Sequence, residues 1–459
     1  MRPRLSIEGG AVRLEGPLLF VRRTLEAGLN EAVEVSGSDG RSRLGRIAAL
    51  DEQLMTIEVL ESPDGLALAD TVLRLRGAPL EFALGPGILG RVFNGIGEPV
   101  DGGPPLPARL LQPIDGLPVN PVERALPRDF IETGISAIDL MNSLVRGQKL
   151  PLFSCGGLPH DRIAVDIATH ARLRGGSDDF AIVFAGIGVP FDSADFFRRS
   201  LEKSGALART ALFLNLASDS STQRLLTPRF ALTAAEYLAF EEGRHVLVIL
   251  TDMTNYCEAL REVSSSKGEV PGRKGFPGYL YSDLAQLYER AGCLRGRAGT
   301  LTQLPILTMP SDDIGHPVPD LTGYITEGQI VLSRDLDRLG IHPPVDVLPS
   351  LSRLMKDGIG GGYTHADHPA LANQLYAAYA RAVQARVLSS VVGDDGMTPV
   401  DRSYLAFGQA FERELLHQSA ARSLEASMET GWRLLAGLPE GELTRLSDAQ
   451  IAAHLRGRR

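Results

Sequence analysis

A turn at residues 154–161 is the first place in this sequence where phosphate chemistry could be expected. A short apolar segment from residue 149 leads through Gly156 and Gly157 to a predicted helix start, which is the layout of a phosphate-binding P-loop. A working P-loop has the pattern GxxxxGK[ST], because its backbone N–H groups cradle phosphates, its lysine binds the β and γ oxygens, and its hydroxyl binds Mg²⁺.

Three positions in this turn lack the required groups. Pro159 stands where the last glycine belongs and has no N–H, His160 replaces the lysine, and Asp161 replaces the hydroxyl residue. Asp161 would also place a negative charge where a triphosphate would lie. Residues Gly156, Gly157, Pro159, His160 and Asp161 therefore form a degenerate P-loop that is not expected to bind phosphate. Taken alone, an ordinary strand–turn–helix connection explains the stretch better.

Two further segments have the form of nucleotide-site motifs. Residues 244–252 are an apolar strand that ends in Asp252, as in a Walker B segment, whose carboxylate orients the water shell of Mg²⁺. A buried strand followed by a capping aspartate is the simpler interpretation of Asp252. The strand at 181–185 enters a glycine-rich turn that could present a catalytic acid to water, but Val189 and Pro190 follow instead.

Arg353 is a candidate for binding phosphate oxygens. It follows a proline-rich turn, and a guanidinium keeps its charge and can bind γ-phosphate oxygens through two parallel hydrogen bonds. From spacing alone, a structural ion pair is the favoured interpretation. Residues 310–320 combine acids with His316, but their spacing matches no known ligand geometry, so no metal site is predicted.

The composition indicates a globular protein rather than a nucleic-acid or membrane-spanning one. Hydrophobic residues make up 44% and charged residues 22% of 459 positions, and the net charge is -9 without a long basic run. The longest apolar runs fall far short of the ~20 residues of a membrane span. The first residues lack the apolar stretch of a signal peptide. The three widely spaced cysteines predict buried thiols in a reducing cytosol.

The elements that must position these residues fall into three predicted domains. Residues 1–77 contain short strands separated by turns, which predicts a β-barrel or sandwich. Residues 78–364 begin with a Gly- and Pro-rich connection and then alternate strand and helix, which predicts an α/β domain with a parallel sheet. Residues 365–459 have helical periodicity. Within the central domain, Asp192 is expected to cap a helix that Gly205 ends, and Thr227-Pro228 to begin another.

In order and in detail, these motifs resemble the B subunit of V/A-type rotary ATPases, the non-catalytic subunit of their head. The resemblance covers nearly the whole chain. The stretches that carry it are residues 16–20, 89–95, 130–139, 158–160, 250–262, 271–279, 320–329 and 348–355. Residues 154–157 depart slightly from the family, and the N-terminus and residues 446–459 match nothing specific.

The resemblance implies a fold and a role. The fold is an N-terminal β-barrel, a central RecA-like α/β domain with the degenerate P-loop, and a C-terminal helical bundle. In the family's A3B3 head, A supplies the P-loop and catalytic glutamate, while B supplies an arginine across the interface. Arg353 matches that arginine, Ser352 and Tyr324 fall at the same nucleotide interface, and Asp252 is the Walker B-like residue.

The resemblance also implies partners and a location. ATP or ADP with Mg²⁺ would be held mainly by the A subunit, with no nucleotide or metal bound by this chain alone. The partners would be A, the central shaft, the peripheral stalk and, indirectly, the membrane sector that moves protons or sodium. The complex would lie on the cytoplasmic face of the cell membrane, and residues 271–279 would be interface surface.

Three other interpretations compete with this one. The chain could be an autonomous RecA-like ATPase of an export apparatus, but His160 and Val189 stand where that activity needs Lys and Glu. It could be a nucleic-acid motor, which the acidic balance disfavours. It could also be a purely structural subunit, and the behaviour of Arg353 separates that role from the favoured one.

Overall fold

The computed structural model describes residues 5–8, 10–116, 121–174, 179–393 and 396–456. These residues divide into two compact units. The first unit consists of Met1–Val122, Ala181–Glu242 and Val248–Arg290, and the second of Glu123–Phe180, Gly243–Leu247 and Ala291–Arg459. Each unit therefore takes segments from distant parts of the sequence.

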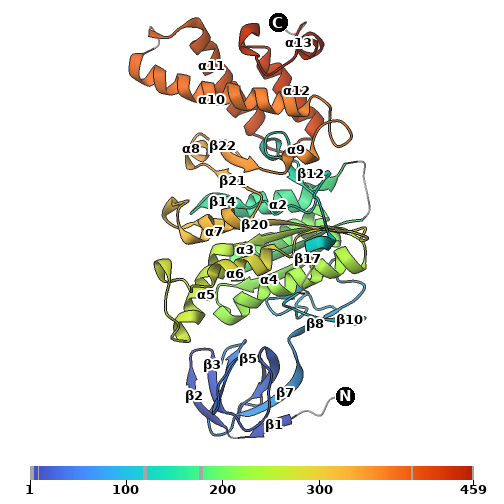
Figure 1. The fold of residues 1–459 in the computed structure, drawn as a ribbon, viewed down its shortest axis with the longest axis vertical. Coiled ribbons are helices and arrows are strands. Elements are labelled where there is room, and N and C mark those ends of the chain that lie inside the picture. Colours follow the sequence, from blue (N-terminus) through green and yellow to red (C-terminus); the bar gives the residue numbers. More distant parts are fainter. Residues whose placement is uncertain (1–4, 9, 117–120, 175–178, 394–395, 457–459) are drawn as a thin grey trace. The chain divides into compact units, whose positions relative to one another are not determined.

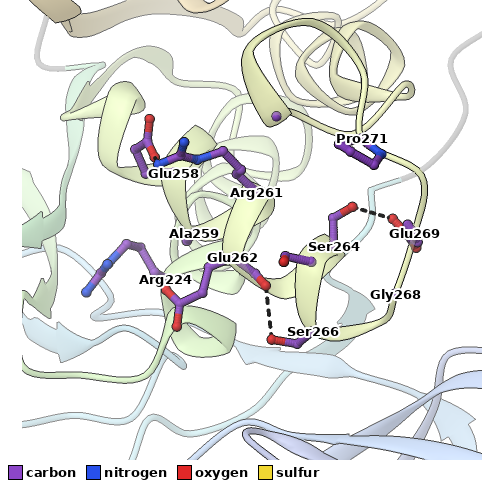
Figure 2. Close-up of a pocket in the computed structure, with 12 residues that line it drawn as sticks. Arg224, Glu258, Ala259, Arg261, Glu262, Ser264, Ser266, Gly268, Glu269 and Pro271 are labelled. Atoms are coloured by element: carbon purple, nitrogen blue, oxygen red, sulfur yellow. Dashed lines mark hydrogen bonds and ion pairs between the residues drawn. The ribbon is translucent and has the colours of Figure 1, made fainter.

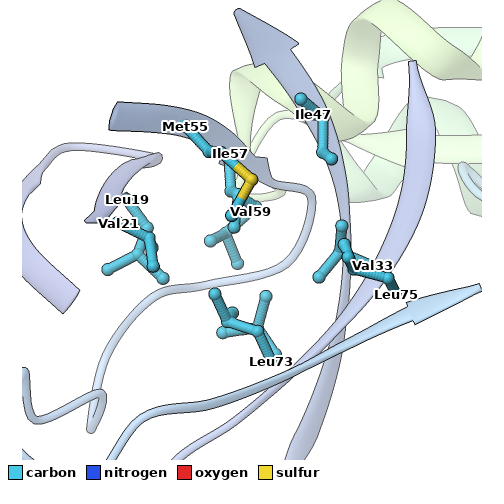
Figure 3. Packing of buried hydrophobic residues seen from close by; sticks show 10 residues of the cluster. Leu19, Val21, Val33, Ile47, Met55, Ile57, Val59, Leu73 and Leu75 are labelled. Atoms are coloured by element: carbon cyan, nitrogen blue, oxygen red, sulfur yellow. The ribbon is translucent and has the colours of Figure 1, made fainter. Parts of the chain in front are cut away.

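The N-terminal part of the first unit is a seven-stranded antiparallel sheet that encloses its own core (Figure 1). Along the sheet the strands are β1 (Leu5–Glu8), β7 (Val72–Pro79), β4 (Glu31–Ser36), β5 (Ser42–Leu50), β6 (Leu54–Val59), β3 (Leu18–Arg22) and β2 (Ala11–Glu15). Side chains alternate across it: Leu73 and Leu75 are buried, whereas Arg74 and Arg76 are exposed. Ten buried apolar side chains, Met55 among them, form the core in Figure 3.

The rest of the first unit is α/β. Four strands lie in the order β18 (His245–Thr251), β16 (Phe180–Val189), β17 (Thr210–Leu216) and β9 (Val92–Asn94). Residues 245–247 of β18 and residue 180 of β16 belong to the second unit. All ten residues of β16 are buried, as expected for a strand that is covered on both faces. The helices are α3 (Phe191–Ser204), α4 (Ser221–Glu236), α5 (Met253–Ser266) and α6 (Leu280–Tyr288), and β8 (Glu81–Leu84) pairs with β10 (Leu110–Pro113).

The second unit contains the strands that carry the turn at 154–161 and Arg353. Their order is β22 (Val345–Ser352), β21 (Gly328–Leu332), β14 (Leu152–Cys155) and β20 (Thr300–Met309). β14 runs parallel to β20 and β21, and β22 runs antiparallel to β21. β19 (Gly292–Leu294) joins β20 to β11 (Arg124–Ala125), and a small sheet contains β13 (Leu144–Val145), β12 (Phe130–Glu132) and β15 (Arg172–Leu173).

Helices complete the second unit. The short ones near the sheet are α1 (Ser136–Asp139), α2 (His160–His170), α7 (Pro317–Ile325), α8 (Arg334–Arg338) and α9 (Met355–Gly358). The C-terminal ones are α10 (His368–Val392), α11 (Pro399–Ala410), α12 (Leu424–Leu435) and α13 (Asp448–His454), coloured orange to red in Figure 1. Gln418 connects them to the α1 region, because it accepts a hydrogen bond from Ser136 N (2.8 Å) and donates to Gly134 O (2.7 Å).

The described backbone also contains short 3₁₀ and π-helical turns. They are the 3₁₀ turns η1 (Pro121–Glu123), η2 (Ala206–Arg209), η4 (Arg273–Gly275), η5 (Pro310–Asp312) and η8 (Glu440–Glu442), and the π-helical turns η3 (Tyr237–Glu241) and η7 (Phe411–Leu416). Among the described residues, none of the helices is long and apolar enough to cross a membrane.

Two predicted helix starts were wrong. α3 begins one residue before Asp192, and its cap residue is Pro190, whereas the predicted end at the left-handed Gly205 is confirmed. Thr227 and Pro228 lie inside α4, which begins six residues before Thr227 and is capped by Ser220. The missing N–H of a proline normally disfavours a helix interior, yet α4 continues through Pro228 in a buried turn, where Thr227 Oγ1 also donates to Gln223 O at 3.0 Å. The domain boundaries at 77/78 and 364/365 stay predictions.

Candidate functional site

The predicted strand, glycine turn and helix start are all present at residues 149–161. β14 ends at Cys155, Gly156 and Gly157 are exposed in the turn, and α2 begins at His160. Gly157 has φ = 83°, a left-handed conformation that glycine adopts at low cost. The layout of a P-loop is thus retained even though its phosphate-binding groups are absent.

The backbone of this turn is already hydrogen-bonded within the chain. Leu158 N donates to Cys155 O (3.1 Å) and His160 N donates to Leu158 O (2.9 Å), so these N–H groups do not form a phosphate cradle. Arg334 Nη2 donates to Gly156 O at 3.0 Å, so a carbonyl of the turn binds a side chain from another segment. Two N–H groups of the turn are thus engaged within the chain, and the loss of a phosphate site here stays a prediction.

The side chains of the turn also bond to each other. His160 Nδ1 lies 3.1 Å from Ser154 Oγ, and its Nε2 lies 3.6 Å from Asp161 Oδ1. These short-range contacts turn the imidazole toward its own turn. Burial raises the pKa of the neighbouring Cys155 thiol above its usual value, so that thiol is less reactive than an exposed one.

The other two candidate motifs lie in the first unit. Asp252 follows β18 and caps α5, where its carboxylate accepts a hydrogen bond from Thr254 N at 2.7 Å. Val189 ends β16 and is 3% exposed, so the position where a catalytic acid would stand holds a buried aliphatic side chain. The geometry gives Asp252 the capping role that sequence reasoning favoured, and its Walker B-like role stays a prediction.

Arg353 is exposed immediately after β22. Its N–H donates to Glu327 O at 2.9 Å, and its guanidinium Nη1 donates to Thr326 O at 3.3 Å. Both bonds go to backbone carbonyls, and no carboxylate of the described residues forms an ion pair with the guanidinium. Such an arginine can bind an anion from outside the chain.

Tyr324 and Ser352 flank Arg353 in different ways. Tyr324 lies near the end of α7, just before Thr326, and its side chain is 77% exposed. Ser352 is buried, and its hydroxyl donates to Ser143 O at 2.8 Å and lies 3.0 Å from Gln148 Nε2. Tyr324 therefore faces solvent near Arg353, whereas the Ser352 hydroxyl supports the backbone beside it.

Arg353 and the degenerate P-loop lie at opposite ends of the same strands. The turn follows the carboxyl end of β14, which runs parallel to β21. Ser352, by contrast, pairs with Gly328 at the amino end of β21. Within the second unit the fold thus separates these two predicted sites.

Sequence reasoning missed two ion pairs that hold these segments. Arg334, which bonds the turn, is paired with Asp312 at 2.9 Å. Lys149, which directly precedes the apolar strand, is paired with Glu327 at 2.9 Å. Pairs this distant in sequence have no local pattern, although a lysine beside a buried apolar run signals that a partner is needed.

Comparisons with known proteins agree over nearly the whole chain. Residues 12–76 match the beta-barrel domain of the ATP synthase alpha/beta family, residues 134–352 its nucleotide-binding domain, and residues 357–455 the C-terminal domain of V and A type ATP synthase. The V-type ATP synthase beta chain of Halothermothrix orenii is 52% identical over 450 residues, covering 98% of this chain and 97% of the relative. The B subunit of the A-type ATP synthase of Aeropyrum pernix is 52% identical over 440 residues, or 95% of each.

The chain belongs to the family of V/A-type ATP synthase B subunits. A solved structure, the ATP synthase subunit NeqB of Nanoarcheaum equitans, has a TM-score of 0.74 and 38% identity, and covers 93% of this chain and all of that one. The resemblance to B subunits and the predicted fold, with β-barrel, central α/β domain and helical C-terminal domain, are confirmed.

In this member of the B-subunit family, the described surface also has a hollow beside residues 271–279. This cavity has a volume of about 730 Å³ and is lined by the end of α5 and the loop that follows it (Figure 2). Ser264 Oγ donates to the Glu269 carboxylate at 2.6 Å, and Tyr279 donates to the same carboxylate at 2.8 Å. These bonds fix the loop against α5, and Val270 at its tip is 88% exposed.

Proposed function

We propose that this chain is the non-catalytic B subunit in the head of a V/A-type rotary ATP synthase or ATPase. It forms an alternating A3B3 ring with catalytic A subunits and supplies Arg353 as an arginine finger to the nucleotide site of a neighbouring A subunit. ATP or ADP with Mg²⁺ is held mainly by A. The complex couples ATP synthesis or hydrolysis to the movement of protons or sodium ions.

The observation that carries the proposal is the contrast between the two ends of the β14–β21 sheet. At one end, the turn at 154–161 lacks the P-loop lysine and uses the N–H groups of Leu158 and His160 internally, which supports a turn that does not hold phosphate. At the other end, Arg353 is exposed and its guanidinium bonds a neutral backbone carbonyl. A chain with a closed phosphate loop and an available guanidinium is suited to complete a site that another subunit provides.

The chemistry of phosphoryl transfer explains what the guanidinium would contribute. In the transition state, negative charge spreads over the γ-oxygens and the bridging oxygen, and a fixed cation stabilises this charge more than it stabilises bound ATP. A preformed arginine fork can contact two oxygens at once. Arg353 would therefore raise the turnover number with little effect on nucleotide affinity.

The location and remaining partners follow from the same proposal. The head would lie on the cytoplasmic face of the cell membrane and contact the central shaft and peripheral stalk, with the membrane sector reached through them. Copurification from membranes with the A, shaft and stalk subunits would support this arrangement. Isolation of the chain free of every such subunit would contradict it.

The decisive experiment is Arg353→Ala in a head reconstituted with its A subunit. Removal of an arginine finger is expected to lower kcat by about 10³–10⁵-fold, with ring assembly and nucleotide binding largely kept. Arg338→Ala is the matched control, because Arg338 is an exposed arginine that pairs with Asp335 on α8. An assembled Arg353→Ala head with wild-type kcat would refute the finger role.

A further inference from the structure

The placement of Arg353 depends on a two-residue turn that precedes β21. Arg353 N donates to Glu327 O (2.9 Å) and its Nη1 donates to Thr326 O (3.3 Å), so both ends of the residue are tied to this turn. Thr326 is 2% exposed and its hydroxyl donates to Thr322 O at 2.7 Å. Movement of the turn would therefore move the guanidinium.

Lys149 holds the turn through three bonds to a single residue. Its Nζ lies 2.9 Å from Glu327 Oε1, its N–H donates to Glu327 Oε2 at 2.7 Å, and its carbonyl accepts from Glu327 N at 3.0 Å. The Lys149 side chain is 7% exposed and that of Glu327 is 28% exposed. The carboxylate is thus fixed in orientation by one ammonium and one backbone N–H.

A second contact links this pair to the residue before Arg353. Gln148, fully buried, donates from Nε2 both to Glu327 O (3.2 Å) and to Ser352 Oγ (3.0 Å). Glu327 O therefore receives hydrogen bonds from Gln148 and from Arg353 N. Gly328 completes the frame, because a Cβ at this position would lie 2.0 Å from Leu351 O, so the backbones of β21 and β22 approach closely here.

We propose that the Lys149–Glu327 ion pair is a positioning device that sets the location of the Arg353 guanidinium for catalysis on the neighbouring subunit, an inference that rests on the proposed function. Lys149 and Glu327 touch no substrate in this role. They act through two carbonyls of the turn. The Glu327 carbonyl binds the backbone N–H of Arg353, and the Thr326 carbonyl binds its guanidinium.

The geometry favours a positioning role over simple stabilisation. An ion pair that is partly withdrawn from water adds little net stability, because loss of hydration offsets much of the attraction between the charges. It does fix geometry, since a carboxylate with two donors and a reciprocal backbone bond has few alternative orientations. In phosphoryl transfer, a shift of about 1 Å in a catalytic group costs up to about 100-fold in rate.

The test is a set of variants in the reconstituted head, read by steady-state ATP hydrolysis. Glu327→Gln keeps the shape of the side chain and removes its charge, and kcat is expected to fall by up to about 100-fold with KM nearly unchanged. Glu327→Asp keeps the charge and shortens the side chain by one methylene, and an intermediate fall in kcat is expected. Glu236→Gln is the matched control, because Glu236 is in a buried pair with Arg290 at 2.6 Å and belongs to the other unit of the chain.

A double variant separates a positioning role of the ion pair from a purely stabilising one. In an Arg353→Ala head, addition of Glu327→Gln is expected to cause no further fall in kcat, because the guanidinium it positions is gone. A further fall in that background would overturn the proposal, as would wild-type kcat for Glu327→Gln. If Glu327→Gln does not assemble, Glu327→Asp replaces it in the test. Wild-type kcat of an assembled Glu327→Asp head would overturn the proposal. A lower kcat of that head supports the proposal if Glu327→Asp causes no further fall in kcat when Arg353 is already alanine.

The two proposals fail in distinguishable ways. Wild-type turnover of the Arg353→Ala head would refute the finger and remove the basis of the positioning role. A deficient Arg353→Ala head together with a fully active Glu327→Gln head would refute the positioning role alone. Melting temperatures of all variants should be measured beside kcat, because a purely structural pair predicts a lower melting temperature with unchanged kcat.

Discussion

Arg353 is exposed, and its guanidinium hydrogen-bonds a backbone carbonyl. The planar fork can contact two phosphate oxygens, whereas an ammonium is a compact point charge with another geometry. Arg353→Lys is therefore expected to restore only a small part of the activity lost in Arg353→Ala. Comparison of kcat for the three assembled heads would check this, and near wild-type turnover with lysine would show that charge alone suffices.

The degenerate P-loop leads to a second prediction for a single residue. His160→Lys restores the ammonium of a P-loop but leaves Pro159 without an N–H and Asp161 in place of a hydroxyl. Because Leu158 and His160 also use their N–H groups within the turn, the purified variant alone is expected to release no phosphate from ATP. Steady phosphate release by the wild-type chain without partners would instead support an autonomous ATPase.

The limits of sequence reasoning are clearest for these residues. The strand, turn and helix around Gly156 and Gly157 could be predicted because they are local, and so could the missing N–H at Pro159. The carbonyl contact to Arg334 could not, because it joins Gly156 to a residue far along the chain. The Lys149–Glu327 pair joins positions far apart in sequence for the same reason.

At the scale of elements, tertiary contacts overrode some local signals. The Thr227-Pro228 pair has the sequence of a helix start, but α4 already begins after Ser220, whose hydroxyl accepts from Gln223 N. Ser220 Oγ itself donates to Leu60 O at 2.6 Å, so the β-barrel part of the first unit helps to set the beginning of α4. The true start also has a local signal, because Ser220 with Gln223 three residues later is the pattern of an N-cap, and the contact with Leu60 adds to it.

One carboxylate, that of Asp367, joins the C-terminal helix α13 to the start of α10. Asp367 accepts a hydrogen bond from Gln450 Nε2 at 2.8 Å, and it lies 2.9 Å from His454 Nε2 and 3.6 Å from His365 Nδ1. The Gln450 hydrogen bond, then that with His454, lowers the pKa of Asp367 below its usual value. The sequence analysis matched residues 446–459 to nothing specific, but the match to the C-terminal domain of V and A type ATP synthase extends to residue 455, and this contact gives the described part of the segment a structural role.

The lowered pKa of Asp367 predicts a pH-dependent attachment of α13. A carboxyl group whose pKa is lowered in the folded state stabilises that state above its unfolded pKa of about 4, and this stabilisation is lost as the pH falls through the lowered value. Asp367→Asn should therefore weaken the attachment at neutral pH by on the order of 1 kcal/mol. The difference from wild type should vanish in strong acid.

Tryptophan fluorescence can report on the attachment of α13. Trp432 is the only tryptophan in the sequence, and its ring stacks on that of His454 at 4.2 Å between centroids. Tryptophan fluorescence during urea unfolding, at several pH values, would compare Asp367→Asn with wild type. Equal unfolding curves for the two proteins at neutral pH would show that Asp367 does not hold α13.

At the scale of the whole molecule, the family assignment accounts for features that a chain acting alone would not need. The first unit exposes Val270 (88%), Tyr279 (40%) and Tyr281 (44%) in or beside the loop after α5. Clustered exposed apolar side chains favour contact with another protein. Their loop is held in shape by the Glu269 carboxylate, so little ordering would be needed on assembly.

Val270→Asp should weaken ring assembly without destabilising the isolated chain. The side chain is almost fully exposed in the monomer, so its replacement changes few internal contacts and the melting temperature should stay the same. On assembly the aspartate would be buried against the A subunit, and an unpaired carboxylate loses its hydration there at considerable cost. Leu29→Asp is a suitable control, because Leu29 is 62% exposed on the β-barrel part of the same unit. Light scattering of each variant titrated with the A subunit would measure assembly; equal assembly by Val270→Asp and wild type would place the interface elsewhere on the chain.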